Sequence, residues 1–199
     1  ELLLPYKSFL EKSSNLALVS LPEDFGYIRR FLYERSSQTK SYPSLSEAAA
    51  GIDRDQDELP GARDLINYYG PAGTIPSVHY YQMVDPENPI PKEVFKDKIV
   101  FVGLVLQTDI GPAQKDVFMT PFGRIFGTEI HATAALNLIH QNWIHRLPAW
   151  IELTSLTLFA FIVTTIIFSL RPLWASLALI ITLIGWSIVA YNYFLQGIF

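Results

Sequence analysis

The sequence contains no cysteine among its 199 residues. This absence excludes disulfide bonds, thiolate metal sites and cysteine nucleophiles together. The sequence also lacks a glycine-rich phosphate-binding loop, a serine nucleophile elbow and the histidine spacing of zinc proteases. Hydrophobic residues nevertheless make up 50% of the chain, which excludes a disordered polypeptide. The sequence therefore describes a folded protein without a recognisable catalytic motif.

Charged side chains are nearly absent from the last quarter of the chain. Of its 34 charged residues, 32 lie between Glu1 and Arg146, and the last 53 positions contain only Glu152 and Arg171. The two apolar runs that result are long enough for helices that cross a bilayer core of about 30 Å. We therefore predict transmembrane helices at residues 149–170 and 173–196. Two buried helices of a soluble core are the alternative, although apolar runs of this length are unusual there.

The dipeptide Arg171-Pro172 leaves room only for a tight turn between the two apolar runs. The predicted helices therefore form a hairpin, which returns the chain to the side of the membrane from which it came. The positive-inside rule does not orient this hairpin, because it compares only Arg146 before the first span with Arg171 in the turn.

The polar region, residues 1–148, contains 14 Lys and Arg against 18 Asp and Glu. This mildly acidic balance argues against binding to nucleic acid and against adhesion to anionic lipid. The region is long enough to form a hydrophobic core of its own. We expect it to be one α/β domain, with a mixed sheet and flanking helices.

Local patterns predict several elements of this domain. Apolar residues at 15–20 and 27–33 flank a turn-like segment that ends in Gly26 and predict a β-hairpin. Ser44 and Glu47 have the spacing of a capping box and predict a helix from about residue 44 to residue 50. A short strand is expected at 65–69, before Gly70 and Pro71.

The run Ile-Val-Phe-Val-Gly at residues 99–103 has no polar member. Lack of alternation is typical of a strand that is buried on both faces, so we predict the central strand of the sheet here. Residues 104–127 contain two prolines and three glycines and are predicted to form a long loop. Long loops in compact domains are often functional, and this one is therefore the place to look for a binding site.

A helix is predicted from about Thr128 to Gln141, with an apolar stripe that packs on the sheet. The stripe consists of Ala132, Ala135, Leu136, Ile139 and Trp143. Only a few residues around Arg146 separate this helix from the first apolar run. A shift of the first helix can therefore be passed to the second, whereas a long flexible linker would absorb it.

Metal and catalytic sites are not indicated by the spacing of titratable residues. Glu129 and His131 are two positions apart, which places their side chains about 200° apart on a helix and prevents them from sharing a metal ion. The alternating Asp53, Asp55 and Asp57 resemble the start of a calcium loop but lack its glycine and its distal glutamate. We therefore expect no metal, no cofactor and no catalytic residue in this chain.

The order of five segments resembles the CHASE type-two domain. These are Asp-Phe-Gly-Tyr-Ile-Arg-Arg at 24–30, the helix at 44–50, the strand at 65–69 with Gly-Pro-Ala-Gly-Thr at 70–74, the strand at 98–103, and Asp-Val-Phe-Met-Thr-Pro at 116–121 followed by Gly-Thr-Glu-Ile-His-Ala at 127–132. CHASE domains are extracellular sensing domains associated with cyclases and histidine kinases. The resemblance covers about residues 15–145, and transmembrane helices typically follow such domains.

The resemblance implies the sensor region of a bacterial transmembrane receptor. Residues 1–148 would lie outside the inner (plasma) membrane and would lack the N-terminal part of the domain. A cytoplasmic adenylate or guanylate cyclase or kinase domain, not present in this chain, would be controlled by a small-molecule or protein ligand. The receptor is expected to act as a homodimer. A non-catalytic membrane subunit whose α/β domain docks a partner in a larger complex is the alternative.

Candidate ligand-binding residues follow from the expected strand ends, because open α/β sheets bind ligands beyond the ends of their strands. The candidates are Tyr68, Gly70, Pro71, Asp116, Thr120, Glu129 and His131. In the alternative interpretation, Asp116, Thr120 and Glu129 only cap the loop and the helix.

Overall fold

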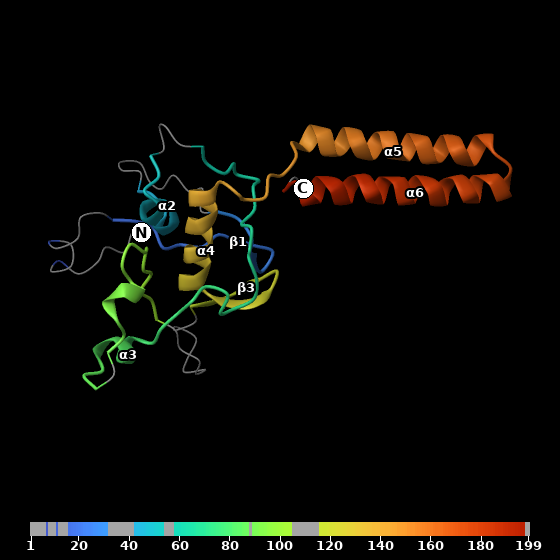
Figure 1. Ribbon diagram of the computed structural model, residues 1–199. Coiled ribbons are helices and arrows are strands. Elements are labelled where there is room, and N and C mark those ends of the chain that lie inside the picture. Colours follow the sequence, from blue (N-terminus) through green and yellow to red (C-terminus); the bar gives the residue numbers. More distant parts are fainter. Residues whose placement is uncertain are drawn as a thin grey trace. The chain divides into compact units, whose positions relative to one another are not determined.

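The computed structural model describes residues 7, 11, 16–31, 42–53, 58–87, 89–104 and 116–197 (Figure 1). The chain divides into two compact units, Glu1–Trp143 and Ile144–Phe199. The first unit combines helices with two small sheets, and the second contains a pair of long apolar helices. The fold is therefore mixed α/β with a C-terminal pair of helices, as predicted from the sequence.

The first sheet is a hairpin of two short strands, β1 (Glu23–Asp24) and β2 (Tyr27–Ile28). The two residues between them, Phe25 and Gly26, both have positive φ, which matches the twist of a two-residue hairpin turn. A hairpin was predicted here, but with strands at 15–20 and 27–33. The segment predicted as a turn itself forms the first strand, while Leu18 makes a parallel bridge to Ser44 instead.

Helix α2 (Leu45–Ala50) begins at Ser44, whose hydroxyl accepts a hydrogen bond from the backbone N–H of Glu47. The Glu47 carboxylate accepts in return from the backbone N–H of Ser44 at 2.6 Å. Gly51 ends the helix in the left-handed conformation. The capping box predicted from the sequence is confirmed.

The prediction of a central strand at 99–103 is wrong. Among the described residues this segment belongs to no strand, and Val102 is 84% exposed. An apolar run indicates that a segment is suited to burial but does not supply the neighbouring strand that it needs. The strand predicted at 65–69 is likewise reduced to one bridge, between Arg30 and Leu65, although Ile66 and Tyr68 are buried.

The predicted long loop at 104–127 contains the second sheet. Strands β3 (Val117–Thr120) and β4 (Gly123–Phe126) pair antiparallel, with Thr120 opposite Gly123. The predicted loop was wrong here because Pro121 and Phe122 form the two-residue turn of this hairpin, and Gly123, which we interpreted as a loop residue, begins β4 with a positive φ. The residues from 105 to 115 lie outside the described part of the chain.

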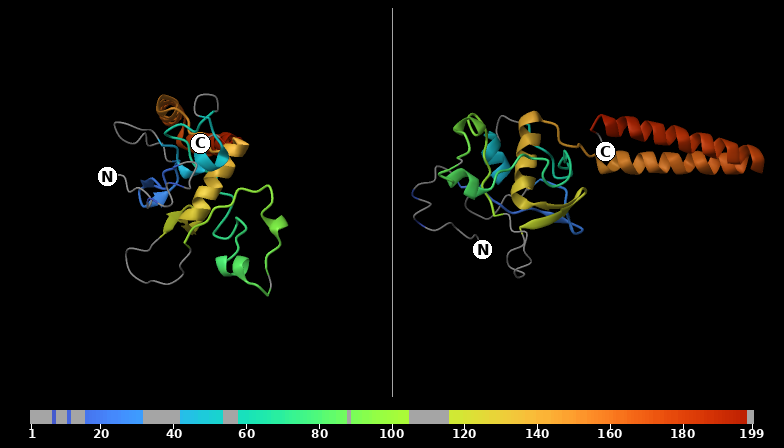
Figure 2. Two further views of the ribbon diagram at one scale, coloured as in Figure 1. Left: turned by 90° about the vertical axis from the view of Figure 1, so that its left-hand side faces the viewer. Right: turned by 60° about the horizontal axis from the view of Figure 1, so that its bottom comes forward.

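Helix α4 (Gly127–His140) lies in the middle of the first unit (Figures 1 and 2). It packs mainly on α2, with the β3–β4 hairpin beside its N-terminal end. Nine of its 14 residues are buried, so the predicted single apolar stripe is wrong, and Ile139 of that stripe is exposed. The surrounding core contains Ile28, Ile66, Tyr68, Ile125, Ile130 and Ala134.

Two shorter helices lie on exposed parts of the first unit. They are α3 (Tyr80–Val84) and the 3-10 turn η1 (Lys92–Val94), and neither contains a buried residue. They take no part in the site described below.

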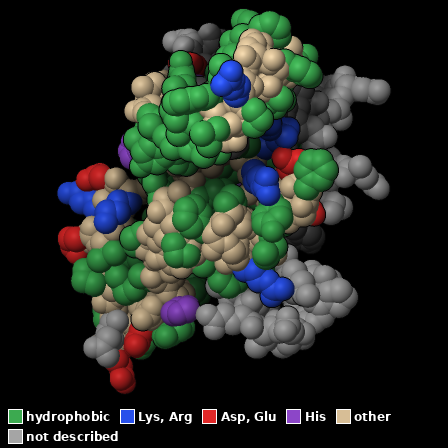
Figure 3. All heavy atoms as spheres, turned by 90° about the vertical axis from the view of Figure 1, so that its right-hand side faces the viewer, with side chains coloured by type: hydrophobic (Ala, Val, Ile, Leu, Met, Phe, Trp, Pro, Cys, Tyr) green, Lys and Arg blue, Asp and Glu red, His purple; other side chains and the backbone are tan. Residues whose placement is uncertain are grey.

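The second unit consists of α5 (Ala149–Ser169) and α6 (Pro172–Leu195). Phe159 of α5 packs against Trp186 of α6, with ring centroids 4.9 Å apart. Both helices are long and apolar enough to cross a membrane, and Ala175 is the one buried residue in their described part. The space-filling view looks onto the turn between these two helices, and many of the side chains visible at this end of the pair are hydrophobic (Figure 3).

Candidate functional site

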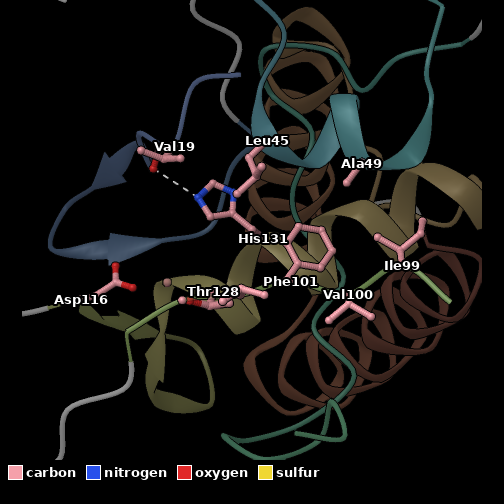
Figure 4. A pocket seen from close by; sticks show the side chains of 12 residues that line it. Val19, Leu45, Ala49, Ile99, Val100, Phe101, Asp116, Thr128 and His131 are labelled. Carbon is pink, nitrogen blue, oxygen red and sulfur yellow. Dashed lines mark hydrogen bonds between the residues drawn. The ribbon is translucent and has the colours of Figure 1, made fainter. Parts of the chain in front are cut away.

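A cleft of about 350 Å³ opens in the first unit between α2, the start of α4 and the extended segment that follows η1 (Figure 4). Most of its lining is apolar: Val19, Leu45, Ala49, Ile99, Val100, Phe101 and Val102, with Gly103 and Gly127. The polar lining residues are Asp116, Thr128 and His131. In the view of Figure 4 these three lie toward one end of the lining, and Ile99 and Val100 lie toward the other.

The imidazole of His131 is buried and held on both sides. Its Nε2 lies 3.1 Å from the carbonyl oxygen of Val19 and must donate, because a carbonyl only accepts. Its Nδ1 lies 3.4 Å from the hydroxyl of Ser46, which also donates to the carbonyl of His131 at 3.2 Å. Burial lowers the pKa of His131, and this effect is partly opposed by the bond to Val19 and by the charge of Asp116. His131 is therefore neutral at pH 7 and bridges α4 to α2.

Asp116 immediately precedes β3, and its carboxyl group interacts electrostatically with His131. Burial raises the pKa of the Asp116 carboxyl, and the neighbouring His131 opposes that rise. Its carboxylate makes no side-chain hydrogen bond with any other described residue, whereas its backbone carbonyl accepts from Gly127 N–H at 2.9 Å. A Cβ at Gly127 would overlap the Asp116 carboxylate, so a larger residue at this position would force that side chain to move.

Gly103 makes a second close approach to the start of α4. A Cβ at this position would overlap the hydroxyl of Thr128. The extended segment therefore runs directly over the first turn of α4 and closes one side of the cleft.

Glu129, Gly70 and Pro71 form a different group that does not line the cleft. The Glu129 carboxylate accepts from the backbone N–H of Gly73 at 2.9 Å and of Ile75 at 3.2 Å. The hydroxyl of Thr74 donates to the Pro71 carbonyl at 2.6 Å. These bonds fix the turn at 70–75 against the N-terminal end of α4, which is a structural role.

Tyr68 and Thr120 point into the core. The Tyr68 hydroxyl donates to the Ile28 carbonyl at 3.0 Å, and burial raises the pKa of Tyr68 above its ordinary value. Thr120 is 1% exposed, and its hydroxyl donates to the carbonyl of Gly123 across the hairpin turn. Of the seven predicted residues, the structure therefore brings only Asp116 and His131 together in the cleft.

Our reading of the sequence missed a polar network at the other end of α4. The fully buried Asn137 pairs with the backbone of Asn67: its Oδ1 accepts from Asn67 N–H at 2.8 Å, and its Nδ2 donates to the Asn67 carbonyl at 3.1 Å. Asn137 Nδ2 also lies 3.0 Å from the Tyr69 hydroxyl, which donates to Asn142 Oδ1 at 3.1 Å. An asparagine among alanine and leucine residues in a helix was the available signal.

Sequence reasoning also missed the contribution of α2 to the cleft. Leu45 and Ala49 line it, and Ser46 holds His131. Their spacing on one face of a short helix indicates burial, but no local pattern shows which segment they bury against. Contacts of this kind are set by tertiary structure.

The site offers no arrangement for metal binding among the described residues. No three His, Asp or Glu side chains within those ranges lie close enough to hold an ion. The Asp116 carboxylate has no hydrogen-bond partner among the described residues and lies near the neutral imidazole of His131, and this arrangement suits recognition of a ligand by charge and hydrogen bonding.

Comparison with known proteins identifies one family. The family model described as CHASE2 domain matches residues 7–170, well over half of the chain. CHASE2 domains are extracellular sensor domains of signalling receptors. No curated protein shows a significant match to this chain, and neither does any solved structure.

Proposed function

Because this chain belongs to the CHASE2 family, we propose that it is the extracytoplasmic sensor region of a bacterial transmembrane receptor. In this proposal α5 and α6 cross the inner membrane, residues 1–148 lie outside it, and Arg171 faces the cytoplasm. A ligand that occupies the cleft shifts α4, and the membrane helices carry the shift to a cytoplasmic cyclase or kinase domain. The receptor acts as a homodimer. No reaction is assigned to this chain itself.

The observation that carries the proposal is the continuity of α4 with the segment that precedes α5. The first turn of α4 borders the cleft through Gly127 and Thr128, and its last residue is His140. Only residues 141–148 then separate it from α5. A packed helix moves as a rigid body, so a displacement at its first turn reaches its last turn.

Both ends of the connecting segment are anchored. On the side of α4, the Asn67 side chain donates to the Asn142 carbonyl at 3.0 Å, and the buried Trp143 makes a T-shaped ring contact with Phe31. On the side of α5, Arg146 Nε donates to Glu152 Oε1 at 3.1 Å. Anchors at both ends leave fewer residues of this segment to absorb a shift than a flexible linker would have.

The test is an insertion of Gly-Ser-Gly-Ser between Arg146 and Leu147 in the whole receptor. We expect the cyclic nucleotide level or phosphoryl transfer of the output domain to stop responding to the stimulus, because the insertion absorbs the shift. The matched control is the same insertion between Asp85 and Pro86, in a turn away from the cleft, and it should keep the response. A full response from the first variant contradicts the proposal.

One observation favours a second candidate function, a membrane subunit that docks a partner through its α/β domain. Ile99, Val100 and Val102 are large apolar residues that lie exposed in a row. Exposed apolar patches are typical of interaction surfaces. In this case aspartate at Val102 would abolish co-purification of a partner protein, whereas retention of that partner by the variant would exclude this candidate.

A further inference from the structure

We propose that the cleft binds a small amphipathic cation, with an apolar body against its walls and an ammonium group beside Asp116. This inference rests on the proposed sensor function, since it names the ligand class of the same cleft. It is carried by the chemistry of the lining, by the unpaired carboxylate and by the size of the cavity.

The walls determine the body of the ligand. Seven of the 12 lining residues are Val, Leu, Ile, Phe or Ala side chains, contributed by α2, by Val19 and by the extended segment. Ligand pockets are usually lined in this way, with few polar groups that fix orientation. An engineered apolar cavity of about 150 Å³ holds benzene, so the cleft can take a molecule of one or two rings.

Asp116 determines the charge of the ligand. It is the one acidic residue of the lining, and the described part of the chain offers its carboxylate no hydrogen-bond donor. A partly buried carboxylate without a donor is destabilised, and an ammonium group would supply both the hydrogen bond and the opposite charge. The ligand thus provides a donor that the described part of the chain does not offer.

His131 does not compete for this role. Its Nε2 is used by Val19, and its Nδ1 faces Ser46. Burial lowers the pKa of His131, so the neutral form prevails at pH 7 and the lining carries a net negative charge. The imidazole therefore neither neutralises Asp116 nor attracts an anion.

An anionic ligand is disfavoured at the same place. The positive end of the α4 dipole would otherwise attract an anion, but it already has the Asp116 carboxylate against Gly127 and Glu129 in the first turn. A second anion would meet the Asp116 carboxylate directly, and like charges at short range repel.

The test compares three probes of similar shape on the full chain in lipid nanodiscs, with empty nanodiscs as the reference for partitioning. The probes are phenethylamine, 2-phenylethanol and phenylacetate, and binding is measured by isothermal titration calorimetry. We expect saturable binding of phenethylamine that is at least tenfold tighter than binding of the alcohol, and no saturable binding of phenylacetate. Equal binding of amine and alcohol, preference for the acid, or no binding of the amine overturns the proposal.

Variants locate the site. Asp116→Asn should reduce the affinity for phenethylamine to that for the alcohol, whereas Asp85→Asn, the same change of charge on a turn outside the cleft, should leave it unchanged. Ala49→Trp should fill the cleft and abolish binding of both. Unchanged amine binding in either cleft variant overturns the proposal, and the comparison of probes on the unmodified chain decides it even if a variant fails to fold.

The two proposals fail separately. If the chain binds the amine at Asp116 but the insertion after Arg146 leaves the response of the receptor unchanged, the proposed coupling is wrong and the proposed ligand class stands. If the insertion abolishes the response but the chain binds the alcohol or the acid more tightly than the amine, the proposed sensor function stands and the proposed ligand class is wrong.

Discussion

Polar side chains in helix α4 differ from those in helices α5 and α6 in where their hydrogen-bond partners lie. In α4, the side chains of His131 and Asn137 are buried and bond to Val19, to Ser46 and to residues 67–69. In α5, the hydroxyls of Thr154, Thr157 and Thr165 each donate to the carbonyl four residues earlier in the same helix.

This difference shows what surrounds each helix. Thr133 of α4 also bonds within its helix, to the Glu129 carbonyl, but His131 and Asn137 have partners in other segments and therefore fix the position of α4 in the unit. The polar groups of α5 are satisfied within the helix, which leaves an apolar exterior suited to hydrocarbon. The hydrogen bonds thus distinguish His131 and Asn137, which are buried by protein, from the threonines of α5, whose bonding would suit a lipid environment.

The largest expected effect comes from placing a charge on the exterior of α6. Arginine at Ile184, which is 55% exposed, should disfavour membrane insertion by about 3 kcal/mol if lipid covers that position. Ile139→Arg, at an exposed position of α4, should change stability by less than about 0.5 kcal/mol. Alkaline extraction of membranes measures the first variant and thermal unfolding the second. Equal retention of Ile184→Arg and the wild type would place α6 outside the bilayer.

Removing the buried amide of α4 should have the next largest effect. Asn137→Ala leaves the backbone N–H and C=O of Asn67 without their partners and should destabilise the first unit by about 2–3 kcal/mol. Hydrogen exchange of residues 127–143 measures the loss.

Asn192→Ala in α6 is the matched control for this amide. Its Nδ2 bonds only within its own helix among the described residues, to the Ile188 carbonyl at 2.8 Å. We expect exchange of residues 127–143 to stay as in the wild type. If both variants behaved alike, the contrast between α4 and α6 would not hold.

A methyl group at Gly103 should destabilise the first unit by about 1–3 kcal/mol, because it meets the Thr128 hydroxyl. The double variant Gly103→Ala with Thr128→Ala should recover part of this loss, because it removes the hydroxyl and the methyl group but leaves the Cβ of residue 128, which lies 2.9 Å from the added Cβ. Gly185→Ala in α6 is the control, since no heavy atom lies within 4 Å of its added Cβ. Thermal unfolding of the wild type, of Gly103→Ala, of Thr128→Ala and of the double variant measures the coupling, and strict additivity would contradict the close approach.

The smallest expected effect is a pH dependence of the stability of the first unit, caused by His131 of α4. Burial lowers the pKa of His131 in the folded state, so the unfolded state binds its proton more readily. The stability contribution is therefore fully present above the unfolded pKa of about 6.5 and declines as pH falls through the lowered folded value. His131→Gln should flatten this decline in thermal unfolding between about pH 7.5 and 5. His140→Gln, at the exposed end of α4, should retain it.

The elements that could be predicted from sequence are those with a local signal. The capping box at Ser44 and Glu47, the helical pattern after Gly127 and the uncharged runs of α5 and α6 need no knowledge of the rest of the chain. The ends of each of these helices lie within two residues of the predicted ends.

The remaining elements depend on partners that a local pattern does not identify. The run at 99–103 has the composition of a buried strand, but no described segment pairs with it. Within the site, Asp116 and His131 come together because the strand β3 begins next to the start of α4. Tyr68 and Thr120 instead face the core, since side-chain direction depends on packing.

Orientation across the membrane is the central claim, and cysteine labelling measures it directly, because these 199 residues contain no cysteine and any cysteine elsewhere in the protein can be replaced by serine. Single substitutions Asp85→Cys and Arg171→Cys are introduced into the whole protein, and intact cells are treated with a maleimide that does not cross the inner membrane. The account predicts labelling of Asp85→Cys in intact cells and labelling of Arg171→Cys only after the membrane is opened. Labelling of both positions from outside, or the reverse pattern, would contradict an extracytoplasmic sensor on a membrane hairpin.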